Sequence, residues 1–330
     1  VSEYKKICIN SYKRSFGNEI ISFDKLDQNK HIANLFNGPT YAFKDFALQL
    51  LGNIYEYVLK KREIKLTILG ATSGDTGSAA IDGCSKSDNV KIFILFPFNK
   101  VSEVQRKQMT TVKKKNVFNI AVKGNFDDCQ RMVKNYFKFN NENKKINLAA
   151  VNSINWVRIM GQIVYYFWSY FRVTNKFEPL SFVVPTGNFG NAYAGYMSKK
   201  MGLPIKKIIV SSNKNDILTR FFKTGKMEIK KTLTSLSPSM DIQVSSNFER
   251  LLFDFYENGK MIKKLFNKLE NKKEFSIANS HLKKMRETFG YGKLSDSETK
   301  TTISQIYNKY KLFIDPHTAV GISVGEKELN

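Results

Sequence analysis

The fold class is decided by residues 65–77, which read KLTILGATSGDTG. The apolar run 65–69 predicts a short buried strand, and the small residues after it predict a loop that opens a helix from Ser78 onward. A strand that enters such a loop before a helix can bind an anion, because the first N–H groups of the helix are free and its dipole favours negative charge. An ordinary strand–helix turn, with Asp75 or Thr76 as the helix cap, would explain the same residues.

A second loop of this kind lies at residues 185–191, which read PTGNFGN. It follows the apolar run 181–184 and precedes a predicted helix at 192–200. Its two glycines allow the backbone to approach a ligand closely, and its N–H groups can bind a phosphate without any charged side chain. Both loops follow strands, so we expect each to open at the carboxyl edge of an α/β sheet, where ligands bind.

Outward from these loops, short apolar runs alternate with helical patterns. Further buried strands are predicted at 90–96, 117–122, 146–151 and 207–210, and amphipathic helices at 47–58 and 127–139. This alternation predicts an α/β fold with mostly parallel sheets covered by helices on both faces.

No Pro- or Ser-rich linker marks a domain boundary, so we predict two lobes that the chain crosses more than once. Residues 61–155 would form a small mobile lobe, and residues 1–60 and 156–330 a large lobe. The strands near Leu66, Ile92, Ile120 and Leu148 would then lie in one sheet, and those near Val183 and Ile209 in another.

One lysine stands out in residues 38–45, which read GPTYAFKD. Gly-Pro-Thr predicts a turn into the helix at 47–58, which places Lys44 in the first helical turn. A cation there opposes the helix dipole, and Phe43 and Phe46 are apolar neighbours, so we expect a neutral, nucleophilic amine. An ordinary surface lysine in a lysine-rich chain is the alternative, and the local features alone favour it.

Composition narrows the function classes. At 330 residues the chain can hold two ordinary domains, and 42% hydrophobic residues support a core. The net charge of +24 would suit a nucleic-acid or membrane partner, yet the lysines are scattered and the densest cluster, 113–115, lacks interleaved aromatics. We therefore favour compositional drift with a solvated surface, and expect no nucleic-acid and no membrane partner.

No apolar run approaches the roughly 18 residues needed to cross a bilayer, and no apolar leader is present. The three cysteines lack CxxC spacing and the three histidines lie far apart, so we expect neither a metal site nor disulfides. A reducing, cytoplasmic location follows as the default expectation.

Five segments, in order along the chain, resemble the signature motifs of threonine synthases, a pyridoxal-phosphate-dependent family. Residues 36–45 resemble FxGPTxAFKD, residues 71–77 match ATSGDTG, and residues 185–191 match P-[ST]-GNFG-[DN]. Residues 151–155 with Arg158 resemble the NSIN segment, and residues 315–320 resemble DPHTAV. The resemblance implies the two-lobed, three-layer αβα fold of tryptophan-synthase-β-like enzymes of fold type II.

The resemblance also implies a reaction, the conversion of O-phospho-L-homoserine and water into L-threonine and phosphate, the last step of threonine biosynthesis. Lys44 would be the catalytic residue and would bind pyridoxal 5'-phosphate as a Schiff base. The cofactor would also contact Gly187, Asn188, Phe189, Gly190, Asn191 and, at its pyridine nitrogen, Thr318. The expected substrate-binding residues are Ser73, Asp75, Thr76, Asn152, Ser153, Asn155 and Arg158. We expect a monomer or weak homodimer.

Several alternatives stay open. A related phospho-lyase that acts on O-phosphothreonine would share these motifs, and a basic binding protein on an inactive scaffold would explain the charge. Arg158 has a guanidinium suited to the substrate phosphate, but it would equally suit a helix surface. His317 is a less favoured acid–base candidate, and Asp315 is expected to be a turn residue before Pro316.

Overall fold

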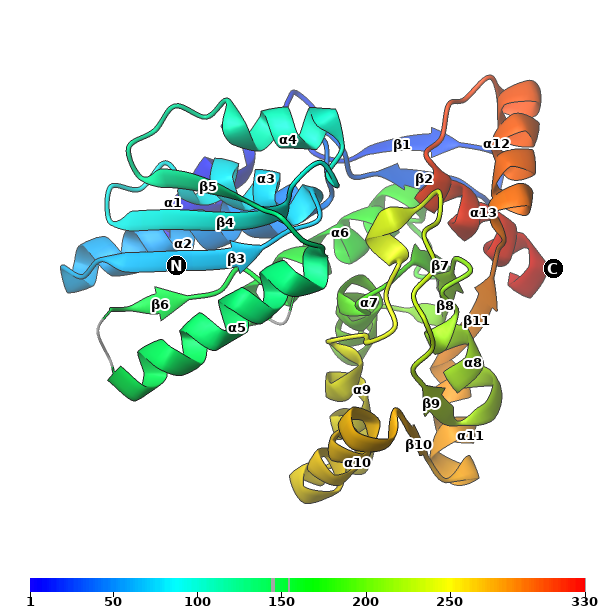
Figure 1. The fold of residues 1–330 in the computed structure, drawn as a ribbon. Coiled ribbons are helices and arrows are strands. Elements are labelled where there is room, and N and C mark those ends of the chain that lie inside the picture. Colours follow the sequence, from blue (N-terminus) through cyan, green and yellow to red (C-terminus); the bar gives the residue numbers. More distant parts are fainter. Residues whose placement is uncertain (144–145, 154, 330) are drawn as a thin grey trace. The chain divides into compact units, whose positions relative to one another are not determined.

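The computed structural model describes residues 1–143, 146–153 and 155–329 (Figure 1). Contacts divide the chain into two compact units, Val1–Gly161 and Gln162–Asn330. Within the described residues, no helix has both the length and the apolar character that a membrane span requires.

The first unit contains a four-stranded parallel sheet in the order β5-β4-β3-β6. Its strands are β3 (Leu66–Ala71), β4 (Val90–Pro97), β5 (Val117–Val122) and β6 (Leu148–Ala149). The helices between and around them are α1 (Ser2–Tyr12), α2 (Lys44–Arg62), α3 (Asp75–Cys84), α4 (Glu103–Thr110) and α5 (Phe126–Asn143). An antiparallel pair, β1 (Ser22–Lys25) and β2 (His31–Asn34), precedes α2, and α6 (Trp156–Val173) runs across the boundary between the units.

The core of the first unit forms because β3 and β4 bury their apolar side chains against α2 and α3. Ile68, Ile92 and Ile94 are almost fully buried with Leu48 and Ile81 of the two helices. Where α2 and α3 meet, a side-chain carbon at Gly52 would lie 2.0 Å from the carbonyl oxygen of Gly83, so only glycine permits this approach.

The second unit contains a three-stranded parallel sheet in the order β11-β8-β7. Its strands are β7 (Leu180–Pro185), β8 (Ile205–Ser212) and β11 (Phe289–Lys293), and a short antiparallel pair joins β9 (Lys226–Glu228) to β10 (Glu274–Ser276). The helices are α7 (Gly190–Lys200), α8 (Ile217–Thr224), α9 (Phe248–Tyr256), α10 (Gly259–Lys272), α11 (Asn279–Thr288), α12 (Asp296–Tyr310) and α13 (Pro316–Leu329), with a 3₁₀ turn at Pro238–Met240.

Aromatic rings fill the centre of the second unit. Phe189, Phe221, Phe222, Phe248 and Phe289 are fully or almost fully buried, and Phe221 and Phe248 pack edge to face with ring centroids 4.7 Å apart. Such pairs stabilise a core beyond the burial of their area alone. The loop residue Phe189 therefore anchors its loop to the core by its side chain.

The predicted α/β fold with mostly parallel sheets is confirmed, and so is the distribution of six strands between two sheets. The predicted helices at 47–58, 127–139 and 192–200 are all present. Helix α3 begins at Asp75, three residues before the expected start at Ser78, because the loop turns directly into the helix after Gly74. The predicted strand at 146–151 is paired only at Leu148 and Ala149.

The lobe boundaries at residues 60/61 and 155/156 stay a prediction, because a division by contacts does not show which segments move together. The strands β1, β2, β9, β10 and β11 were not predicted, and each is three to five residues long.

Candidate active site

Lys44 is the first residue of α2, and only 9% of its surface is exposed. The turn that leads to it is held by Asp45, whose carboxylate accepts hydrogen bonds from the backbone N–H of Thr40 and from its hydroxyl, both at 2.8 Å. Burial raises the pKa of the Asp45 carboxyl to about 6, and the hydrogen bonds from Thr40 offset that only in part. A side-chain carbon at Gly38 would lie 2.5 Å from Asp45, which explains the glycine of this motif.

Lys44 does not stand alone in an apolar setting. Its Nζ lies 2.6 Å from Oδ2 of Asp75, the first residue of α3, and 5.3 Å from the centroid of the Phe43 ring. The alternative interpretation of Lys44 as an ordinary surface lysine is wrong, because Lys44 is buried. Asp75 supplies a countercharge for an ammonium group at Lys44. The local sequence around Lys44, from which a neutral amine was expected, does not indicate this contact.

The loop at residues 71–77 is shaped by one buried hydroxyl. Oγ1 of Thr72 accepts hydrogen bonds from the N–H groups of Gly74 at 3.0 Å and Gly77 at 2.9 Å. Gly74 has φ of +148°, a backbone conformation that favours glycine. Among the described residues, the N–H groups of Ser73 and Thr76 have no acceptor, so the loop retains free donors at the start of α3.

The segment 152–158 leads into α6. The side chain of Asn155 caps this helix by accepting a hydrogen bond from the N–H of Val157 at 3.0 Å. Arg158 is 4% exposed and its Nη1 donates to the carbonyl oxygen of Val151 at 3.1 Å, so the interpretation as a helix-surface arginine is wrong. Asn152 is exposed and Ser153 is half-buried, whereas Ile154 of the same motif lies outside the described residues.

In the second unit, two carbonyl groups of the loop after β7 accept hydrogen bonds from residues 245–247. The hydroxyl of Ser245 donates to the carbonyl of Gly187 at 2.8 Å, and the backbone N–H of Asn247 donates to that of Asn188 at 3.0 Å. Phe189 adopts a left-handed conformation with φ of +63°, which its buried ring stabilises against the strain.

The backbone N–H groups of the same loop remain able to donate hydrogen bonds to a ligand. Within the described part of the chain, the backbone N–H groups of residues 187–192 donate to no acceptor. Oδ1 of Asn188 is buried and likewise has no partner among the described residues. The side chain of Asn191, by contrast, is engaged by the hydroxyls of Tyr165 and Tyr166 at 2.8 and 2.9 Å.

The segment 315–318 starts α13. Asp315 caps this helix, since its carboxylate accepts from the N–H of His317 at 2.8 Å and from the hydroxyl of Thr318 at 2.5 Å. Burial opposes ionisation of Asp315, but the hydrogen bonds from His317 and Thr318 outweigh it and lower the pKa of this carboxyl. Asp315, which was expected to be a turn residue before Pro316, acts in the structure as the cap of this helix.

These observations fit a phosphorylated cofactor that bears an aldehyde. The free N–H groups at the start of α7 suit a phosphate. In the second unit, the buried Asn188 oxygen has no partner among the described residues and can accept a hydrogen bond from a ligand. In the first unit, Lys44 supplies an amine. In the described residues, no three histidine, cysteine, aspartate or glutamate side chains come together.

The structure brings Lys44 together with Asp75 in the first unit, and residues 187–191 lie at the carboxyl end of β7 in the second. That the two groups share one site stays a prediction, as do the roles of the individual residues. Sequence reasoning missed Gln105, whose side-chain amide contacts Asp75. The signal that could have found it is the serine three residues earlier, a helix-cap pattern.

Comparison with known proteins decides the family. Residues 33–264 match the family described as "Pyridoxal-phosphate dependent enzyme". Over 322 residues, 97% of this chain and 69% of the relative, the chain is 48% identical to a protein named threonine synthase from Pseudomonas aeruginosa. The chain belongs to the threonine synthase family of pyridoxal-phosphate-dependent enzymes.

Other members of the threonine synthase family agree with this assignment. A Saccharomyces cerevisiae threonine synthase is 45% identical over 91% of this chain and 63% of its own length. The crystal structure of a pyridoxal-phosphate-bound threonine synthase from Brucella melitensis superposes with a TM-score of 0.95 at 42% identity, covering 99% of this chain and 70% of that chain. The chain thus spans about two thirds of the length of these threonine synthases.

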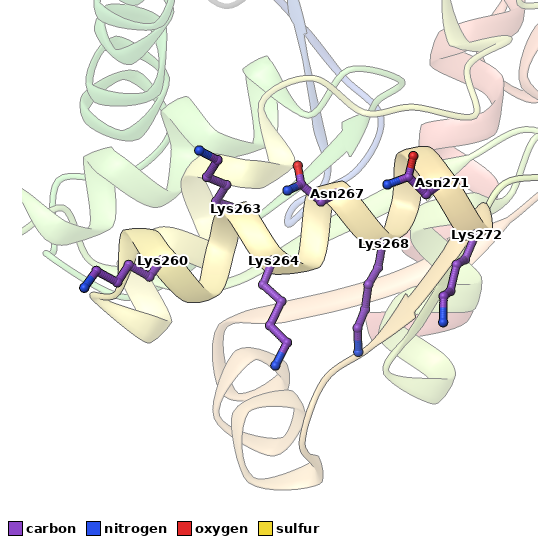
Figure 2. A pocket seen from close by; sticks show the side chains of 7 residues that line it. All are labelled: Lys260, Lys263, Lys264, Asn267, Lys268, Asn271 and Lys272. Carbon is purple, nitrogen blue, oxygen red and sulfur yellow. The ribbon is translucent and has the colours of Figure 1, made fainter.

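A shallow depression along α10 lies apart from the threonine synthase motifs. Figure 2 shows the side chains of Lys264, Lys268 and Lys272 extending to one side of the helix. The buried face of α10 carries Ile262 and Leu265, so these lysines form the solvated face of an amphipathic helix. The depression contains no residue of the five motifs and has no part in the candidate site.

Proposed function

We propose that this chain carries the activity of a threonine synthase, which converts O-phospho-L-homoserine and water into L-threonine and phosphate. The observation that carries the proposal is the buried Lys44 at the start of α2, with its amine 2.6 Å from Asp75. A cation at a helix N-terminus opposes the helix dipole, so the position is unfavourable for a lysine unless its amine has a use there, such as forming a Schiff base.

Bound pyridoxal phosphate supplies an electron sink for charge that develops on the substrate. Lys44 would hold it covalently through Nζ. The N–H groups of residues 187–191 would bind its phosphate, the oxygen of Asn188 would meet a ring substituent, and the hydroxyl of Thr318 would contact the pyridine nitrogen. The hydroxyl of Thr318 donates to Asp315 in this structure, so it has to turn before it can donate elsewhere.

Lys44 is also the proposed acid–base group. Once substrate takes its place, its free amine would move protons at Cα, Cβ and Cγ of the substrate. Asp75 would stabilise the protonated form of the amine between these transfers, because an opposite charge at this distance favours the ammonium.

The proposed substrate-binding residues come from two segments of the first unit. The loop residues Ser73 and Thr76 offer free N–H donors at the start of α3, beside Asp75. Asn152, Ser153, Asn155 and Arg158 would form the other side. The guanidinium of Arg158 is the best candidate for the substrate phosphate, because its planar fork matches two phosphate oxygens.

We further propose that the substrate is the only partner the site requires, with no nucleic acid and no membrane, and that the chain works in the cytoplasm as a monomer or weak homodimer. The scattered lysines and the absence of a membrane-spanning helix from the described residues support this proposal.

The test is product analysis with the purified chain and pyridoxal phosphate. Visible absorbance of bound cofactor and formation of threonine and phosphate from O-phospho-L-homoserine are expected. Lys44→Ala should lose both the absorbance and the turnover, since no other residue supplies the amine. Full activity of Lys44→Ala would refute the assignment. A 2-oxo acid and ammonia from O-phosphothreonine would favour the phospho-lyase instead.

A further inference from the structure

Helix α4 contacts both of the motifs that surround Lys44, although none of its residues belongs to a motif. Its cap residue Ser102 accepts a hydrogen bond from the N–H of Gln105 at 3.3 Å, and the Ser102 hydroxyl donates to Oε1 of Gln105 at 2.9 Å. Because Oε1 is occupied by Ser102, the nitrogen of the Gln105 amide is the atom that remains for another partner.

That partner is Asp75. Nε2 of Gln105 donates to Oδ1 of Asp75, while the other carboxylate oxygen, Oδ2, lies 2.6 Å from Nζ of Lys44. The three side chains thus form a chain of contacts in the order Gln105, Asp75, Lys44. Gly74 accommodates it, since a side-chain carbon there would lie 2.0 Å from Oε1 of Gln105.

One helical turn further on, Gln108 holds the other motif. Its Nε2 donates to the carbonyl oxygen of Thr40 at 3.1 Å, in the turn that precedes Lys44. Met109, fully buried, lies against the first turn of α3, where a side-chain carbon at Gly77 would approach its sulfur to 2.7 Å. Helix α4 therefore fixes the carboxylate partner of Lys44 and the backbone that carries Lys44.

We propose that Gln105 is a positioning residue that, through Asp75, sets the pH at which the Lys44 amine can react, with Gln108 as a second anchor. The inference rests on the proposed function of Lys44. An ammonium group has to lose a proton before the amine can condense with an aldehyde, a step that forms one C=N bond and releases one water. The neutral amide of Gln105 orients Asp75 without adding a charge of its own beside Lys44.

The test measures covalent capture of pyridoxal phosphate by cofactor-depleted protein across a pH series. Capture is followed by visible absorbance, then by borohydride reduction and mass spectrometry of the peptide that contains Lys44. The variants are Gln105→Glu, which keeps the shape and adds a negative charge, Gln105→Ala, which removes the donor, and Gln108→Ala. The matched control is Lys107→Ala on the same helix, because Lys107 is exposed and, within the described residues, forms its ion pair with Glu103.

In Gln105→Glu, a second carboxylate should hold the ammonium form of Lys44 to higher pH, shifting the midpoint of capture upward by about one pH unit. In Gln105→Ala, capture at a fixed pH should slow by about tenfold, because a hydrogen bond to a charged group is lost. Gln108→Ala should slow capture with an unchanged midpoint, and Lys107→Ala should behave as the unaltered chain does.

A midpoint for Gln105→Glu equal to that of the unaltered chain would overturn the proposal, since it would show that the side chain at position 105 is not coupled through Asp75 to the Lys44 amine. If Gln105→Ala fails to fold, the midpoint of capture in the isosteric Gln105→Glu variant still tests the proposal. Absence of capture at Lys44 in the unaltered chain would instead overturn the proposed function, which separates the two failures.

Discussion

Gly187→Ala is expected to destabilise the second unit and to weaken cofactor binding, because this position has no room for a methyl group. A side-chain carbon there would lie 2.9 Å from Cδ1 of Ile242, 3.0 Å from the carbonyl oxygen of Ser239 and 3.2 Å from Cα of Met240. The end of the Ile242 side chain can turn away. The Ser239 carbonyl and the Met240 backbone belong to the 3₁₀ turn at Pro238–Met240, so relief there requires a backbone shift.

The size of the effect follows from this overlap. One surplus methyl group forced against backbone in a packed region costs about 1–3 kcal/mol. The same shift displaces the N–H groups of residues 187–192, which donate to no acceptor in the described part of the chain. Because a phosphate has to meet several of these donors at once, cofactor retention should fall together with stability.

The assay is urea denaturation of the cofactor-free protein followed by circular dichroism, together with cofactor retention through a desalting column. The control is Gly259→Ala at the start of α10, where an added carbon meets nothing within 4 Å. That control should be neutral or stabilise by about 0.4–1 kcal/mol through the unfolded state. The reasoning is refuted if Gly187→Ala unfolds at the same urea concentration as the unaltered chain and retains its cofactor equally well.

Two further predictions concern other motif residues. In the folded protein the pKa of Asp45 is raised from 3.8 to about 6, so between these pH values the folded state binds the proton more tightly than the unfolded state does. The free energy of unfolding should therefore fall by roughly 3 kcal/mol as the pH rises from 3.8 to 6. Asp45→Asn should flatten this dependence in urea denaturation at pH 4 and pH 7, and an unchanged slope would contradict it. Thr318→Val should keep the visible absorbance of bound cofactor yet slow turnover about tenfold, because one hydrogen bond is lost. Turnover at the normal rate would argue that Thr318 does not contact the cofactor.

Much of the fold followed from local patterns. The apolar runs at 90–96 and 117–122 were long enough to predict buried strands, and both lie in the first sheet as β4 and β5. The short strand β11 was not predicted because its residues, FGYGK, contain two glycines and only weak alternation. The strand is stabilised by its neighbours: Phe289 is buried, and Gly292 packs where a side-chain carbon would lie 2.5 Å from Val324. Such context is absent from a local pattern.

For the candidate site, the sequence indicated candidate residues such as Lys44 and Asp75, but it did not indicate which side chains these residues contact. Lys44 and Asp75 are 31 positions apart, and nothing in either motif indicates that their charges meet. The same holds for Gln105, which lies 30 positions beyond Asp75 on a helix whose own sequence is polar. Asp75 and Gln105 meet because the adjacent parallel strands β3 and β4 place the segments that follow them at one edge of the sheet.

The hydrogen bond between Thr318 and Asp315 bears on the proposed contact of Thr318 with the pyridine nitrogen of the cofactor. An acid at that position would keep the nitrogen protonated, whereas a hydroxyl leaves it neutral, and the sequence offered Thr318 as the hydroxyl. In the structure the hydroxyl hydrogen points to Asp315, whose carboxyl has a lowered pKa and stays ionised. A hydroxyl that donates to a carboxylate still has lone pairs to accept with, so in this orientation Thr318 would suit a protonated nitrogen. To serve a neutral nitrogen it has to break a 2.5 Å bond to a charged acceptor. If Thr318 does contact the nitrogen, Asp315 and the nitrogen would compete for one hydroxyl hydrogen, a competition that the motif by itself does not reveal.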